Sequence, residues 1–134
     1  KYLYPSFNCC IVTNLKNNPQ YYFCLQQLMY TKKSTNREYI KSINNAVSLK
    51  QLNYLCSDKS FQENGYTVDK EKWNTKSIDL MFGKFNTIKF KQNPTLLKVL
   101  KSNPHHIDEF DDKWIPKELE QIRFKDHFKS LLDL

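Results

Sequence analysis

The chain has 134 residues, of which 40% are hydrophobic and 14% aromatic, and its formal net charge is +7. This composition excludes a disordered chain, and the length suits a single domain, residues 1–134, with one core. No apolar run approaches the roughly 20 residues of a membrane span, so we expect no membrane association.

The four cysteines and three histidines show no spacing typical of a metal site or of a disulfide framework. Reduced thiols in the core of an intracellular protein, nuclear or cytoplasmic, are the simplest interpretation. Gly65 and Gly83 are the only glycines, which excludes glycine-rich loops for phosphates or dinucleotides. We therefore expect no metal and no cofactor. The cysteines are Cys9, Cys10, Cys24 and Cys56.

The N-terminal third predicts a short strand or hairpin followed by helices. Residues 2–16 contain two β-rich runs that end at turn-prone asparagines. A helix is expected from Gln20 to Thr31, where apolar residues recur at helical spacing. Capping signals at Thr35 and Ser48, each followed three residues later by Glu or Gln, predict two further helices. The polar residues 57–67 predict a loop.

The longest predicted helix runs from Asp69 to Lys91 and has one apolar face. Gly83 in its middle costs about 1 kcal/mol relative to alanine, which predicts a close packing contact there. Asn93 and Pro94 form an N-cap and first-turn pair for the next helix. The apolar positions of the long helix are Ile78, Met81, Phe82, Phe85 and Ile88.

The segment Ile107–Phe110 combines apolar and acidic residues and predicts a strand with one face in the core. Pro116 is expected to start a final helix. The fold class predicted from all these elements is α+β, a mostly helical domain around a small sheet. Candidate core positions of the last helix are Leu119, Ile122, Phe128, Leu131 and Leu132.

The positive charge is almost entirely lysine, since the chain has only two arginines. Lysine suits non-specific phosphate contacts, whereas base-specific reading relies more often on arginine. An A/T-rich genome would produce the same lysine bias without any nucleic-acid function, and both interpretations stay open. The candidate phosphate contacts are Lys72, Lys76, Lys84, Lys98 and Lys101.

Four carboxylates, Asp108, Glu109, Asp111 and Asp112, form the best acid/base candidate on residue type alone. Crowded carboxylates repel one another, so one of them holds a proton more readily and suits work on a glycosidic bond. A solvated turn whose charges cap the next helix or balance nearby lysines is the more frequent arrangement.

A tryptophan, a helix ending near Lys-Phe, an Asn-Pro-x-Leu turn and an acidic residue three before a second tryptophan occur in this order between Trp73 and Trp114. This order resembles the C-terminal half of the NADAR family. Members of that family are N-glycosidases or ADP-ribose hydrolases that act on nucleotide-like substrates. The likeness extends more loosely from Tyr4 to Leu134.

The resemblance also implies where catalytic and pocket residues would stand. The family motif similar to Glu-His-Tyr-Phe-x-Ala-x-Lys matches residues 20–27, so the catalytic glutamate is Gln20 here and the pocket lysine is Gln27. A glutamine neither takes nor gives a proton at neutral pH. Ile115 stands where the family has glycine, whereas Asp111 keeps its family position.

These departures favour a degenerate, non-catalytic NADAR-like domain. We expect a structural or interaction subunit with a protein partner in a nucleic-acid-associated complex, such as a DNA-modifying assembly. The alternative is an active N-glycosidase or ADP-ribose hydrolase with Asp111 or Asp112 as acid/base and Trp73 or Trp114 stacking the base, although packing is the more frequent role of both tryptophans. An accidental resemblance, to an unrelated helical adaptor, would leave no strand at 107–110.

Overall fold

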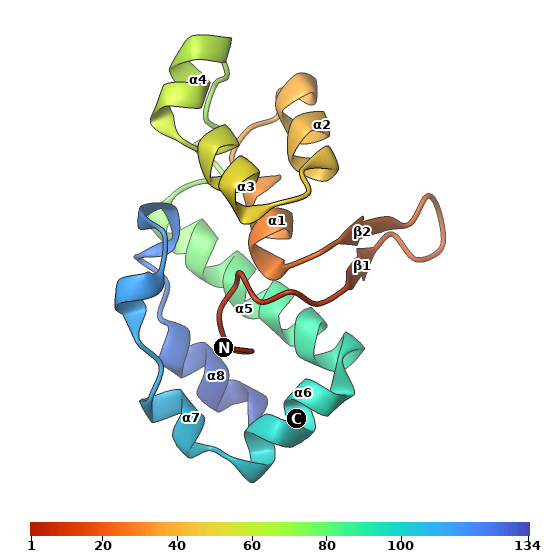
Figure 1. Cartoon of the computed structure of the whole chain (residues 1–134), viewed down its shortest axis with the longest axis vertical. Helices are drawn as coiled ribbons and strands as arrows, with labels where there is room; N and C mark the ends of the chain where they lie inside the picture. The colour runs from red at the N-terminus through yellow and green to blue at the C-terminus, as the bar shows by residue number, and fades with distance from the viewer.

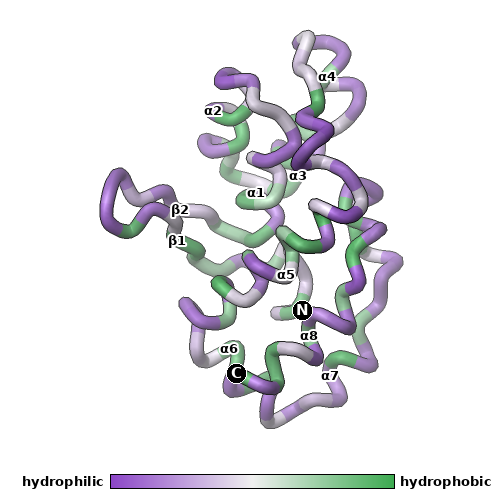
Figure 2. Tube along the Cα trace, turned by 180° about the vertical axis from the view of Figure 1, so that it is seen from behind, coloured by the Kyte–Doolittle hydropathy of each residue, from purple (hydrophilic) through white to green (hydrophobic).

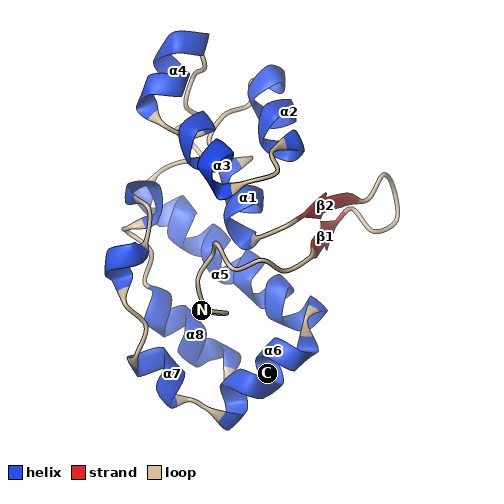
Figure 3. Cartoon of the chain, viewed as in Figure 1, coloured by secondary structure: helices blue, strands red, loops and turns tan.

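Eight α-helices, two short 3-10 helices and one two-stranded antiparallel sheet make up the computed structural model, which describes residues 1–134 (Figure 1). The prediction of a mostly helical α+β fold with a small sheet is confirmed. Figure 3 shows that the sheet is confined to a single hairpin. The elements are β1 (Ile11–Thr13), β2 (Gln20–Tyr22), α1 (Leu25–Tyr30), α2 (Arg37–Asn45), α3 (Leu49–Leu55), α4 (Asp58–Asn64), α5 (Thr75–Gln92), α6 (Pro94–Ser102), α7 (His105–Asp108), the 3-10 helices η1 (Asp112–Trp114) and η2 (Lys117–Leu119), and α8 (Phe124–Leu131).

The hairpin pairs β1 with β2, and Ile11 lies opposite Tyr22. Asn14 and Asn18 take the left-handed conformation, with φ of 55° and 48°, and this reverses the chain between the strands. The prediction of a helix starting at Gln20 is therefore wrong, because strand pairing uses these residues and α1 begins after them. Figure 2 shows that the connecting loop is mostly hydrophilic.

The first two predicted caps have different outcomes. Ser48 caps α3 as predicted, since its hydroxyl accepts a hydrogen bond from the backbone N–H of Gln51. The cap of α2 is Asn36 rather than Thr35, because the Asn36 side chain accepts from the backbone N–H of Tyr39.

The loop predicted at 57–67 is wrong, since most of this segment forms α4. The Ser57 hydroxyl accepts from the backbone N–H of Ser60 and so starts the helix, and Gly65, with φ of 68°, ends it. The segment also buries Phe61, which gives this short polar helix one attachment to the core.

Helix α5 begins six residues later than predicted, at Thr75, because the Asn74 side chain caps it by accepting from the backbone N–H of Ser77. Helix α6 starts at Pro94 as predicted. The Asn93 side chain does not cap it, however, and donates instead to the backbone carbonyl of Cys10 at 3.2 Å.

The strand predicted at 107–110 is wrong, and α7 stands in its place. Ile107 and Phe110 are both buried, and their spacing of three residues suits one side of a helical turn. Such an absence is what an accidental family resemblance predicts. The final helix begins at Phe124 rather than at Pro116, which precedes η2.

One hydrophobic cluster of 26 buried residues runs from Leu3 to Leu131. Helix α1 packs against α2 and α5, and α5 also packs against α6 and α8 (Figure 1). Helix α5 therefore connects the N-terminal helices with the C-terminal ones. No helix combines the length and the apolar character that crossing a membrane requires.

The four cysteines are unbridged, but they are not all core residues. Cys24 and Cys56 are buried, and burial raises the pKa of their thiols to about 11 and about 12. Cys9 is half-buried and Cys10 is exposed, so the prediction of core thiols is wrong for Cys10.

The close contact predicted at Gly83 is confirmed, since a Cβ built there would lie 2.8 Å from Nδ1 of His127. We expect Gly83→Ala to lower the free energy of unfolding by about 1–3 kcal/mol, although alanine is the better helix former by about 1 kcal/mol. Urea denaturation of wild type and variant would measure this change in the free energy of unfolding. In a His127→Ala background the clash disappears, and the same substitution should be neutral or stabilising. An equal loss in both backgrounds would contradict this explanation.

Candidate anion-binding groove

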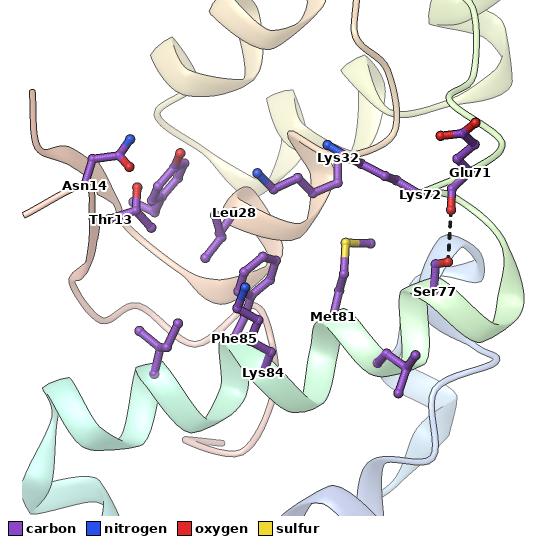
Figure 4. Close-up of a pocket in the computed structure, with 13 residues that line it drawn as sticks. Thr13, Asn14, Leu28, Lys32, Glu71, Lys72, Ser77, Met81, Lys84 and Phe85 are labelled. Carbon is purple, nitrogen blue, oxygen red and sulfur yellow. Dashed lines mark hydrogen bonds between the residues drawn. The ribbon is translucent and has the colours of Figure 1, made fainter.

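A groove of about 620 Å³ lies between the hairpin, the end of α1 and helix α5 (Figure 4). Three lysines from three different segments line it: Lys32 just after α1, Lys72 before α5, and Lys84 on α5. We call this hollow the lysine groove. Its main apolar lining consists of Leu28, Met81, Phe85 and Ile88.

The three ammonium groups have no acidic partner. None of the three lysines forms a salt bridge, and neither does Glu71, the one carboxylate that lines the groove. Burial lowers the pKa of Lys32, and the neighbouring charges of Lys72 and Lys84 lower it further. An anion placed among the lysines would relieve this repulsion.

An aromatic ring lies beneath two of these charges. The Nζ atoms of Lys32 and Lys84 are each 5.9 Å from the centroid of the Phe85 ring. That distance is within the range of a cation–π interaction, which holds the two ammonium groups over the apolar lining. The groove therefore offers positive charge and apolar surface side by side.

The fold brings the lysines together through contacts distant in sequence. The backbone N–H of Asp69 donates to the carbonyl of Lys33 at 2.8 Å, which ties the segment carrying Lys72 to the end of α1. On α5, Met81, Lys84, Phe85 and Ile88 occupy positions i, i+3, i+4 and i+7 and share one side of the helix.

The hairpin wall is fixed to α5 by one side chain. Gln92 donates from Nε2 to the carbonyl of Val12 at 2.8 Å and accepts at Oε1 from the Val12 N–H at 2.9 Å. This pairing satisfies both backbone groups of a β1 residue and holds the strand beside the helix.

Of the five lysines predicted from the sequence, Lys72 and Lys84 line the groove. Lys76 is exposed on the first turn of α5, outside the lining residues, and Lys98 and Lys101 are exposed on α6. Lys101 donates to the carbonyl of the C-terminal residue. Lys32, which was not among the predicted contacts, is the most enclosed of the groove lysines.

The two glutamines at the family motif are not brought together in a site. Gln27 is 2% exposed, and its Oε1 accepts from the N–H of Phe23 while its Nε2 donates to the carbonyl of Ile43 at 3.0 Å. It thus joins α1 to the end of α2. Gln20 lies in β2, half-buried, and its only side-chain hydrogen bond is a 3.5 Å contact with the carbonyl of Tyr21.

The two tryptophans differ in environment. Trp73 is half-buried, and its indole N–H donates at 3.2 Å to Glu118, which also pairs with Lys33 at 3.1 Å. Trp114 is 71% exposed, so the prediction that it is a packing residue is wrong. It is the last residue of η1, which follows an acidic turn.

The acidic cluster forms that turn. Asp111 accepts from the backbone N–H of Lys113 at 3.0 Å and pairs with its ammonium at 3.4 Å, and these contacts lower the pKa of Asp111. A lowered pKa keeps this carboxylate ionised, which is unsuited to a general acid. Asp108, Glu109 and Asp112 are exposed.

One further polar network, which no sequence pattern predicted, joins α5 to α8. Asp79 on α5 accepts from the backbone N–H of Arg123 and from its Nη2, both at 2.8 Å, and contacts Nε2 of His127 at 3.0 Å. Burial would raise the pKa of Asp79, but the hydrogen bonds from Arg123 and His127 outweigh it and lower this pKa to about 2. The network attaches α8 to α5.

The lysine groove is therefore the candidate site, because it concentrates unpaired charge over an apolar surface. No group of three or more His, Cys, Asp or Glu side chains is arranged to hold a metal ion. Comparisons of the chain with family models, with curated proteins and with solved structures find no match.

Proposed function

We propose that this chain is a non-catalytic binding domain that holds phosphate groups of a nucleic acid in the lysine groove. The observation that carries the proposal is the convergence of Lys32, Lys72 and Lys84, none of them in a salt bridge, on one apolar hollow. Lysine binds phosphate as a point charge from many directions, which suits contacts that do not depend on base sequence.

The charge of the whole chain supports the same class of partner. A formal net charge of +7 raises the local concentration of polyanions and speeds their encounter with the protein. Phosphate contacts supply most of the affinity in sequence-independent nucleic-acid binding. A groove with three free lysines is suited to a ligand that carries several phosphates.

The surroundings of the candidate catalytic residues favour binding over chemistry. Asp111 forms a hydrogen bond and an ion pair with Lys113, and the side-chain amide of Gln27 forms hydrogen bonds with backbone groups. Glu71 is the one carboxylate lining the groove, and no histidine or cysteine lies beside it there. General acid–base catalysis needs a titratable group within hydrogen-bond reach of the substrate.

A binding domain without its own chemistry would act within an assembly, so we propose that the chain is an interaction subunit of a nucleic-acid-associated complex. The exposed indole of Trp114 is a candidate contact for the protein partner, since aromatic residues are enriched at interfaces. A degenerate NADAR-like origin is compatible with this function, which is inferred from the groove alone.

Replacing Lys32, Lys72 and Lys84 together by glutamine should weaken nucleic-acid binding roughly 10- to 100-fold, because three phosphate contacts are lost. Fluorescence anisotropy with a labelled oligonucleotide at low salt would measure the dissociation constant. The control is Lys41→Gln, Lys50→Gln and Lys129→Gln, three exposed lysines on α2, α3 and α8 with the same total charge change. Equal weakening by both triple variants would show that net charge, and not the groove, binds the ligand.

A further inference from the structure

A second hollow adjoins the lysine groove. It has a volume of about 750 Å³, lies beneath the loop between β1 and β2, and shares Thr13, Asn14 and Ile88 with the lysine groove. Lys16 and Gln92 line its far part. The two hollows therefore adjoin along α5, and Lys16 adds a fourth lysine to their combined lining; we call this combined hollow the channel.

The length of this channel exceeds that of one nucleotide. It follows α5 from Ser77 to Gln92, fifteen steps of about 1.5 Å each, so about 22 Å. At the stacked spacing of about 3.4 Å per nucleotide, that distance corresponds to about six nucleotides. Single-strand-binding sites commonly accommodate about 4–16 nucleotides.

The lining of the channel distinguishes a single strand from a duplex. Met81 and Ile88 are half-buried, so part of their apolar surface faces the channel between the lysines. A duplex keeps its bases paired inside and presents mainly phosphates and sugars, which leaves such a concave apolar surface unfilled. An unpaired strand presents phosphates to the ammonium groups and base faces to the apolar and aromatic side chains.

We infer that the channel along α5 binds a single strand of nucleic acid, with phosphates at Lys32, Lys72, Lys84 and Lys16 and with bases against the apolar lining around Met81. This inference rests on the proposed function and specifies its ligand. Charge complementarity favours this polyanionic ligand, since four lysines and only one carboxylate, Glu71, line the channel.

The test compares a labelled oligothymidylate of about twelve nucleotides with the duplex that it forms with its complement, by anisotropy over a range of salt concentrations. We expect the single strand to bind about tenfold tighter or more. With three to four phosphate contacts, the logarithm of its association constant should fall with the logarithm of salt concentration at a slope of about −2 to −3.

Three single variants separate the contributions of the phosphate contacts from that of the apolar contact. Lys84→Gln and Lys16→Gln should each make the slope shallower by about 0.7. Met81→Gln should weaken single-strand binding several-fold at an unchanged slope, because it removes apolar contact and no charge. Lys98→Gln, on α6 outside the channel, is the matched charge control and should leave the slope unchanged.

The outcomes that contradict the inference are distinct from failure of the proposed function. A duplex that binds as tightly as the single strand, with both depending on Lys84, overturns the single-strand inference and leaves phosphate binding in place. Indifference to Lys16 overturns the extension of the channel, and indifference to Met81 overturns the contact between bases and apolar lining; both leave phosphate binding in place. If replacing the groove lysines leaves binding unchanged, both the single-strand inference and the proposed phosphate-binding function are overturned.

Discussion

Replacing Asp79 by alanine should lower the free energy of unfolding by about 3 kcal/mol at neutral pH. The carboxylate is largely buried and accepts hydrogen bonds from Arg123 and His127, and hydrogen bonds to charged groups contribute about 1.5–3 kcal/mol each before solvent screening of the exposed Arg123. Urea denaturation would measure the loss. Asp126→Ala, an exposed carboxylate on the same α8 helix, is the control and should change stability little.

The contribution of Asp79 to the free energy of unfolding should also decrease as the pH falls. The pKa of this carboxyl is about 2 in the folded chain and 3.8 as an ordinary aspartate, so the folded state favours the ionised form. The stabilisation is therefore complete above about pH 4 and is lost as pH falls towards about 2. The difference between wild type and Asp79→Asn should shrink over this window, and a constant difference would contradict the assignment.

The helices that the sequence predicted well are those whose signals are local. Ser48 and the Asn93–Pro94 pair predicted the positions where α3 and α6 begin. The helical spacing in the long apolar segment predicted that Ile78 and Phe82 would be buried. Caps and periodicity depend on neighbours within four residues, so one sequence suffices to detect them.

The errors arose where tertiary contacts decided between alternatives. Gln20 precedes an apolar helical pattern, but its segment pairs with β1 across a turn made by two left-handed asparagines. At 107–110 the order Ile-Asp-Glu-Phe led to the prediction of a strand, although its two apolar residues stand three positions apart, which is helical spacing. Burial of Ile107 and Phe110 on the same side settled the choice in favour of α7.

The candidate site was only partly predictable for a related reason. Lys72 and Lys84 could be proposed because both belong to the amphipathic helix predicted from Asp69 to Lys91. Nothing distinguishes Lys32 from the other lysines in the sequence. It joins the groove because the backbone of Asp69 is hydrogen-bonded to that of Lys33, a contact between residues 36 positions apart that no local pattern encodes.

Lys89 lies on α5, fully buried and without a carboxylate partner. Its Nζ donates to the backbone carbonyls of Tyr2 at 2.8 Å and Tyr4 at 3.2 Å, so this ammonium group holds the N-terminal segment against the helix. Burial lowers the pKa of Lys89 to about 8, against the opposing influence of the Cys9 and Cys24 thiols.

This burial predicts an unusual dependence of stability on pH. The folded chain releases the Lys89 proton near pH 8, whereas the unfolded chain keeps it up to 10.5. The unfolded state therefore binds more protons between these values, and the Lys89 contribution to stability rises with pH across this window. We expect the stability of wild type relative to Lys89→Met to increase by about 2 kcal/mol from about pH 7 to about pH 9.5.

Urea denaturation of both proteins at the two pH values would measure this increase. Buried tyrosines and cysteines with raised pKa values oppose it, because they destabilise the folded state as pH rises. They are present in wild type and variant alike, so their effect largely cancels in the difference. Lys98→Met, which replaces an exposed lysine on α6, is the matched charge control. If the difference for Lys89→Met changes with pH no more than that of the control, the N-terminal segment leaves Lys89 open to water.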